Sequence, residues 1–98
     1  MKTLKIWQLK KESQHEFGFE PWRRIKNKFS EDNYKVVYEG IYNDEVHKNV
    51  FDELDYIYGM LNIGKKPEGY TGHSLSTSDI IELDGEKFYV NDYGYIHI

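Results

Sequence analysis

The sequence contains no cysteine, only two prolines and no long hydrophobic run. Without cysteine, the chain can form neither a disulfide framework nor a thiolate metal site. No segment has the length and apolarity of a membrane span, and the first residues lack the apolar run of a signal peptide. We therefore expect a soluble, cytoplasmic protein that has no contact with a membrane.

The residues that are present indicate one folded domain over residues 1–98. Hydrophobic residues make up 39% of the chain and aromatic residues 16%, which is enough for a core and argues against disorder. Nine of the aromatic residues are tyrosines. That number exceeds what one small core can enclose, so some tyrosines are expected at the surface, where they favour contacts with a protein partner.

Charge is distributed unevenly along the chain. Residues 1–30 carry eight Lys or Arg and three Glu, a balance of +5, whereas residues 31–98 carry five Lys and fourteen Asp or Glu, a balance of −9. This asymmetry indicates either a solvated surface or an acidic face that meets a basic protein groove. Since a nucleic-acid binder is normally basic overall, direct nucleic-acid binding is not expected.

Apolar periodicity predicts an α+β fold with a small, largely antiparallel sheet of about five strands. Strands are expected at residues 3–10, 34–42, 79–83, 86–91 and 95–98, with a tight turn at Asp84-Gly85. In the second strand, simple alternation places Tyr34, Val36 and Tyr38 on one face and Val37 and Ile41 on the other.

One main amphipathic helix is expected to pack on this sheet. Asn43 or Asp44 is its expected N-cap, and Gly64 and Pro67 end it. Its apolar stripe comprises Val46, Val50, Leu54, Ile57, Tyr58 and Leu61, and Phe51 widens the stripe. A second, short helix is predicted after Pro21, because Phe19, Trp22, Ile25 and Phe29 recur at helical spacing.

The C-terminal third carries the most distinctive motif. It reads Gly72-His-Ser-Leu-Ser-Thr-Ser-Asp-Ile-Ile-Glu-Leu, followed by Gly85-Glu-Lys-Phe-Tyr-Val and Tyr93-Gly-Tyr. Together with the opening Leu4-Lys-Ile-Trp-Gln-Leu-Lys, these segments resemble the YodL-like domain family. The resemblance implies a small protein of Firmicutes phages, plasmids and integrative elements, and hence a counter-defence role in the bacterial host cell. The family has no established catalytic residues to carry over.

The motif contains the residue types of a hydrolase triad, namely His73, Ser74, Ser76, Ser78 and Asp79. A triad needs side chains that converge in space, which neighbours on one loop seldom do, so a structural or binding loop is the preferred interpretation. The histidines, His15, His47, His73 and His97, lack the spacing of metal ligands. Neither a metal nor a cofactor is therefore expected.

The densest acidic cluster lies on the main predicted helix, at Asp44, Glu45, Asp52, Glu53 and Asp55. It is either a solvated helix face or a surface that engages the basic side chains of a partner. If it binds a partner, Tyr56 and Tyr70 are candidate anchors, and His73 belongs to a second candidate contact, the loop before the hairpin.

Three functional hypotheses follow. The first is a non-enzymatic inhibitor that binds a host defence nuclease, in particular an anti-CRISPR protein that blocks guide RNA or DNA engagement by a type II effector. The second is an adaptor that binds a bacterial cytoskeletal or replication protein through a sheet edge or the His73 loop. The third, ranked last, is a small hydrolase or nuclease built around His73 and Asp79.

Overall fold

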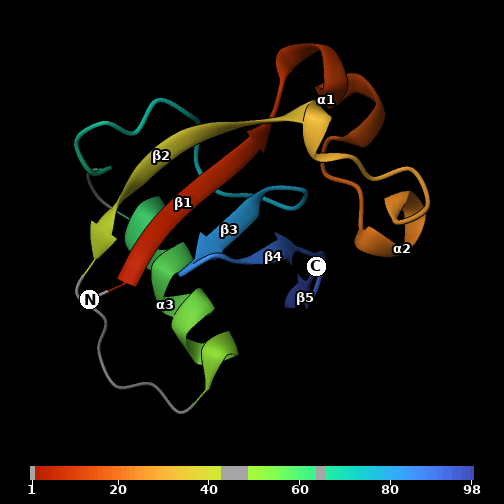
Figure 1. The fold of residues 1–98 in the computed structure, drawn as a ribbon. Helices are drawn as coiled ribbons and strands as arrows, with labels where there is room; N and C mark the ends of the chain where they lie inside the picture. The colour runs from red at the N-terminus through yellow and green to blue at the C-terminus, as the bar shows by residue number, and fades with distance from the viewer. Residues whose placement is uncertain (1, 43–48, 64–65) are drawn as a thin grey trace.

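The computed structural model describes residues 2–42, 49–63 and 66–98, and Figure 1 shows their arrangement. The chain runs through β1 (Lys2–Leu9), α1 (Lys11–Phe17), α2 (Trp22–Ile25), a 3-10 turn (Glu31–Asn33), β2 (Tyr34–Tyr42), α3 (Val50–Asn62), β3 (Ile80–Leu83), β4 (Glu86–Val90) and β5 (Tyr95–His97). In these described residues the strands form one antiparallel sheet in the order β2-β1-β3-β4-β5. The predicted α+β architecture is confirmed.

Apolar side chains cover both faces of the sheet. On one face, Leu54, Ile57 and Leu61 of α3 pack in a cluster with Leu4, Ile6, Leu75, Ile81, Phe88 and Val90. On the other face, Ile25 of α2 is buried with Leu9, Tyr34, Ile80 and Tyr89, and Trp22 and Phe29 pack against them. In Figure 1, α3 accordingly lies against the sheet, while α1 and α2 follow the C-terminal end of β1.

The main helix begins later than predicted. α3 starts at Val50, and its N-cap is Asn49, whose side chain accepts a hydrogen bond from the backbone of Asp52 at 3.0 Å. The predicted caps, Asn43 and Asp44, lie outside the described residues. Phe51 is 48% exposed, so the prediction that it widens the buried stripe is wrong.

The segment before β2 differs most from the prediction. Residues 11–17 form the helix α1, which was not predicted, and α2 spans only four residues. Phe19 does not belong to a helix; it has a positive φ of 62° and is 73% exposed. The rings of Trp22 and Phe29 are in contact, with centroids 5.2 Å apart, so these two residues of the predicted pattern do pack together.

A bulge in β2 overturns the predicted faces of that strand. Ile6 pairs with Tyr38 but Trp7 pairs with Val36, so Val37 is the extra residue. Val37 and Tyr38 therefore both contact the α3 cluster, whereas Tyr34 belongs to the opposite cluster. Simple alternation fails here because the bulge shifts the register by one residue.

The C-terminal meander follows the prediction closely. Asp84 and Gly85 both have positive φ, 50° and 86°, as a two-residue hairpin turn requires. Phe88 and Val90 face the α3 cluster, and Tyr89 faces the other. None of the helices in the described residues is long and apolar enough to span a membrane.

Candidate functional site

The loop of residues 72–79, which precedes β3, is fastened to the sheet through one buried amide. Gln8, in β1, is only 1% exposed. Its Nε2 donates to the carbonyl of His73 at 2.9 Å and to Oδ2 of Asp79 at 3.1 Å. Its Oε1 accepts from the backbone N–H of His73 at 3.1 Å. Because the backbone N–H only donates and the carbonyl only accepts, the amide orientation of Gln8 is fixed.

Two more contacts hold the 72–79 loop in place. Asn62, the last residue of α3, makes a two-way pair with Leu75: its Oδ1 accepts from the backbone N–H at 2.7 Å, and its Nδ2 donates to the carbonyl at 3.0 Å. At Gly72 the loop approaches so closely that an added Cβ would lie 2.1 Å from Oε1 of Gln8 and 2.9 Å from Cβ of Val37. Only glycine fits at that position.

Asp79 is a buried carboxyl group at the end of this loop, 2% exposed. Its Oδ2 accepts hydrogen bonds from Gln8 and from the backbone N–H of Ser76 at 2.9 Å. Burial raises the pKa of Asp79 to about 7, although those hydrogen bonds and the nearby His73 oppose the shift. The carboxyl is therefore poised to exchange a proton near neutral pH.

His73 is exposed, and its ring is turned toward the backbone. Nδ1 lies 2.7 Å from the carbonyl of Ser74, which can only accept, so the neutral ring carries its proton on Nδ1 and its lone pair on Nε2. Ser78 uses its Oγ to accept from the backbone N–H of Phe19 at 3.2 Å. In the described part of the chain, no hydrogen bond joins a serine hydroxyl to the His73 ring, so these residues do not form a hydrogen-bonded triad.

A cleft of about 480 Å³ lies between the 72–79 loop and the segment that follows α1. Its lining comprises Leu9, Gln14, Gly18, Phe19, His73, Ser74, Leu75, Ser76, Ser78 and Asp79. The cleft therefore combines apolar walls, several hydroxyl groups and one buried carboxyl. No group of three His, Asp or Glu side chains suited to a metal ion occurs among the residues that the structure describes.

A second, shallower groove of about 220 Å³ lies between α3 and the turn that joins β4 to β5. It is lined by Asp55, Tyr58, Thr77, Val90, Asn91, Asp92, Gly94 and Tyr95. Two of these residues are acidic and none is basic. Tyr95 donates to Oδ1 of Asp55 at 2.8 Å, and burial, followed by this bond, raises the pKa of the Tyr95 phenol.

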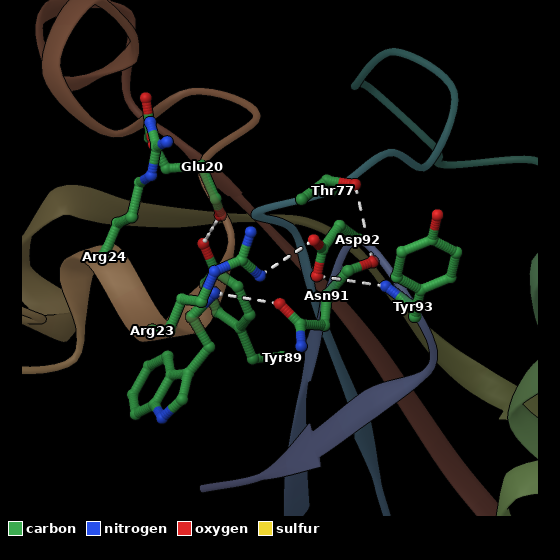
Figure 2. Close-up of polar contacts among 9 residues, drawn as sticks. Glu20, Arg23, Arg24, Thr77, Tyr89, Asn91, Asp92 and Tyr93 are labelled. Carbon is green, nitrogen blue, oxygen red and sulfur yellow. Dashed lines mark hydrogen bonds and ion pairs between the residues drawn. The ribbon is translucent and has the colours of Figure 1, made fainter.

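The segment around α2 holds the β4–β5 turn in position, as Figure 2 shows. Asn91 accepts from the backbone N–H of Trp22 at 2.9 Å, and Arg23 donates to Asp92 at 2.9 Å. The hydrogen bond and charge of Arg23 lower the pKa of Asp92, so this carboxylate is charged at neutral pH. The groove thus has one wall fixed by the N-terminal third of the chain.

The predicted partner-binding acids separate into three groups. Asp52 and Asp55 are exposed on α3 and form no ion pair with a lysine or arginine within the described ranges. Glu53 is 5% exposed and pairs with Lys2 at 2.8 Å, so its carboxylate is not part of the exposed face. Asp44 and Glu45 lie outside the described residues.

The exposed side of α3 also carries large apolar and aromatic side chains. Tyr56 is 41% exposed, Phe51 48% and Met60 38%. We call Phe51, Asp52, Asp55, Tyr56 and Met60 the α3 face. Asp55 belongs to both this face and the second groove, so the two surfaces are continuous.

Tyr70, the other predicted anchor, is held inside the fold. It is half-buried, stacks on Tyr38 with centroids 6.0 Å apart, and donates to the carbonyl of His73 at 2.7 Å. Burial raises its pKa to about 12.

Sequence reasoning missed Gln8 and Phe19. The signal for Gln8 was a polar residue that continues the inward alternation of Leu4 and Ile6.

The fold and site define a small α+β domain in which a loop rich in serine is fastened to the first strand. Residues 3–98 match the YodL-like domain family, and the chain belongs to that family. No curated protein and no solved structure is significantly similar to the chain.

Proposed function

We propose that this protein is a non-enzymatic inhibitor that binds a basic, nucleic-acid-binding nuclease of the host defence through the α3 face. The observation that carries the proposal is the pair of exposed carboxylates, Asp52 and Asp55, beside the exposed ring of Tyr56. Exposed carboxylates attract a basic surface and speed encounter, while aromatic and apolar side chains provide the affinity.

The second groove extends this surface. Asp55 lines this groove with Tyr58 and Tyr95, and Asp92, which also lines it, is paired with Arg23 of the same chain. An arginine-rich or lysine-rich surface that normally binds phosphates complements this arrangement. Nucleic acid itself is a poor ligand here, because its phosphates would meet the same carboxylates.

The particular target that we propose is a type II CRISPR effector, whose guide-binding channel is strongly basic. This choice rests on the mobile-element setting that the YodL-like resemblance implies, together with the charge of the α3 face. In this scheme the protein is an anti-CRISPR protein of a phage or another mobile element, and it occupies the surface that guide RNA or DNA would use.

The test is to mix the purified protein with a type II effector before and after guide loading, and to measure complex formation and DNA cleavage. Inhibition only on addition before the guide supports competition for the guide-binding surface. Asp52→Asn combined with Asp55→Asn should weaken inhibition. Glu12→Gln combined with Glu16→Gln is the matched control, since both residues are exposed on α1 and the change in net charge is the same.

A second candidate is an adaptor that binds a bacterial cytoskeletal or replication protein through the 72–79 loop. The cleft beside this loop and the exposed Phe19 at its edge favour it. Binding through this loop should be insensitive to Asp52→Asn and Asp55→Asn. Absence of binding and inhibition at micromolar concentrations of the protein would reject the effector as the target and place the adaptor first.

A further inference from the structure

Asp79, a buried residue that lines the cleft beside the 72–79 loop, has one carboxyl oxygen without a hydrogen-bond partner among the described residues. Oδ2 of Asp79 accepts from Gln8 and from the backbone of Ser76. Oδ1 has no hydrogen-bond donor in the part of the chain that the structure describes. Asp79 is 2% exposed and lines the cleft, so a donor group that enters the cleft can satisfy Oδ1 when the carboxyl is ionised.

Phe19 also lines the cleft, and its backbone has an unusual conformation. Phe19 has a φ of 62°, a region that costs a residue with a side chain about 1 kcal/mol or more. Its backbone N–H donates to Oγ of Ser78, another lining residue of the cleft, and Phe19 is 73% exposed. The chain thus holds a large apolar ring at the edge of the cleft instead of burying it.

We propose that this cleft binds the arginine side chain of a partner protein. The guanidinium donates to Oδ1 of Asp79, its aliphatic stem lies against Leu9 and Leu75, and the ring of Phe19 stacks on its plane. A cleft of about 480 Å³ has room for one such side chain and its water.

Arginine fits this lining better than other ligands do. Its guanidinium is planar, weakly hydrated and suited both to a carboxylate and to an aromatic face. The ammonium of lysine is compact and strongly hydrated, so it gains less from Phe19. A purely apolar side chain would leave Oδ1 without a donor, and an anion would be repelled by the carboxylate.

The inference does not rest on the nuclease proposal, because the cleft and the α3 face use different residues. Asp79 and Phe19 belong to the cleft, whereas Asp52 and Asp55 belong to α3. A failure to inhibit the nuclease would therefore not contradict the arginine site. A failure to bind arginine would not contradict inhibition through the α3 face.

The test is an NMR titration of the ¹⁵N-labelled protein with Nα-acetyl-arginine N-methylamide. It is performed at about pH 8, above the pKa of Asp79, so that the carboxylate is ionised. The controls are the lysine derivative and the citrulline derivative, which keeps the shape of arginine without its charge. The expected result is saturable shifts of the amides of Gly18, Phe19, Leu75 and Ser76 with the arginine derivative, and much weaker binding of both controls.

Two variants separate this site from a general attraction between charges. Asp79→Asn should weaken binding by about tenfold or more. Phe19→Ala should weaken it by about threefold to tenfold while the exposed position keeps the fold intact. Glu39→Gln, which neutralises an exposed acid of β2 outside the cleft, should leave binding unchanged. Equal binding of the citrulline or lysine derivative, shifts confined to α3, or full binding by Asp79→Asn would overturn the proposal.

Discussion

Gln8 and Asp79 lie 71 positions apart in sequence, and Nε2 of Gln8 donates to Oδ2 of Asp79 at 3.1 Å in the interior of the protein. The same amide exchanges hydrogen bonds with both backbone groups of His73. A single side chain of β1 thereby sets the position of the 72–79 loop. The shape of the cleft depends on this buried polar contact as much as on apolar packing.

Replacing Gln8 by methionine should destabilise the protein. Met keeps the length of the side chain but removes the amide, which leaves the N–H of His73 and Oδ2 of Asp79 short of a partner. We expect a loss of about 2–4 kcal/mol in the free energy of unfolding, measured by urea denaturation. Gln14→Met is the matched control, because Gln14 is exposed and makes only a 3.4 Å bond to the carbonyl of Leu9. A Gln8→Met variant as stable as the control would contradict this account.

Asp79 should make stability depend on pH. Its pKa is about 7 in the folded protein and about 4 in the unfolded chain. Between these values the folded state binds more protons, so the contribution of Asp79 is fully present below about pH 4 and is lost as the pH rises to about 7. Asp79→Asn cannot ionise, so the wild type should lose more stability than this variant between about pH 4 and about pH 8.

Denaturant unfolding of both proteins across this pH range measures the effect. The difference between the two proteins is the relevant quantity, because every other titrating group, including the histidines, is common to both. If the two stability curves run parallel from acid to alkaline pH, Asp79 does not carry a raised pKa in the folded protein.

The parts of the fold that were predictable from the sequence are those that local patterns determine. The Asp84-Gly85 turn needs residues that accept positive φ, and the buried stripe of α3 follows helical spacing through Leu54, Ile57 and Leu61. The bulge at Val37 was not predictable, because it depends on how β2 pairs with β1. Glu53 is buried and pairs with Lys2, 51 positions away, and the local sequence around Glu53 does not indicate this contact.

Only part of the candidate site could be predicted from the sequence. The run from Gly72 to Asp79 drew attention as a motif, yet its residue types suggested a triad that the described residues do not form. Gln8 organises the loop from a strand that reads as ordinary apolar alternation. The spacing of Phe19 was used to predict a helix after Pro21, whereas Phe19 itself lies between α1 and α2 with a positive φ of 62°.

Gly72→Ala should be strongly destabilising. The new Cβ would meet Oε1 of Gln8 at 2.1 Å and Cβ of Val37 at 2.9 Å, so the loop would have to move away from β1 and β2. We expect a loss of about 2–3 kcal/mol in the free energy of unfolding. Because the displaced loop lines the cleft, the amide resonances of Ser76 and Asp79 should also shift. A normal stability with unshifted resonances would show that the loop is not packed as closely as described.

Gly59→Ala should have the opposite effect. Gly59 lies within α3, and an added Cβ would meet nothing within 4 Å. Since alanine favours the helix over glycine, the free energy of unfolding should rise by about 0.5–1 kcal/mol. Thermal unfolding of the two glycine variants side by side gives the measurement. A destabilised Gly59→Ala variant would mean that this surface of α3 is more crowded than the structure indicates.

Glu53→Gln should separate stability from inhibition. Glu53 is 5% exposed and pairs with Lys2 at 2.8 Å, whereas Asp52 and Asp55 are exposed. Neutralising Glu53 weakens a partly buried ion pair, so the free energy of unfolding should fall by about 1–3 kcal/mol, while the folded protein keeps its inhibition of DNA cleavage. The double variant Asp52→Asn with Asp55→Asn should instead keep the free energy of unfolding and lose inhibition of DNA cleavage. Urea denaturation and cleavage assays on the same preparations measure both effects, and a loss of inhibition by a fully folded Glu53→Gln variant would place the binding surface elsewhere on the molecule.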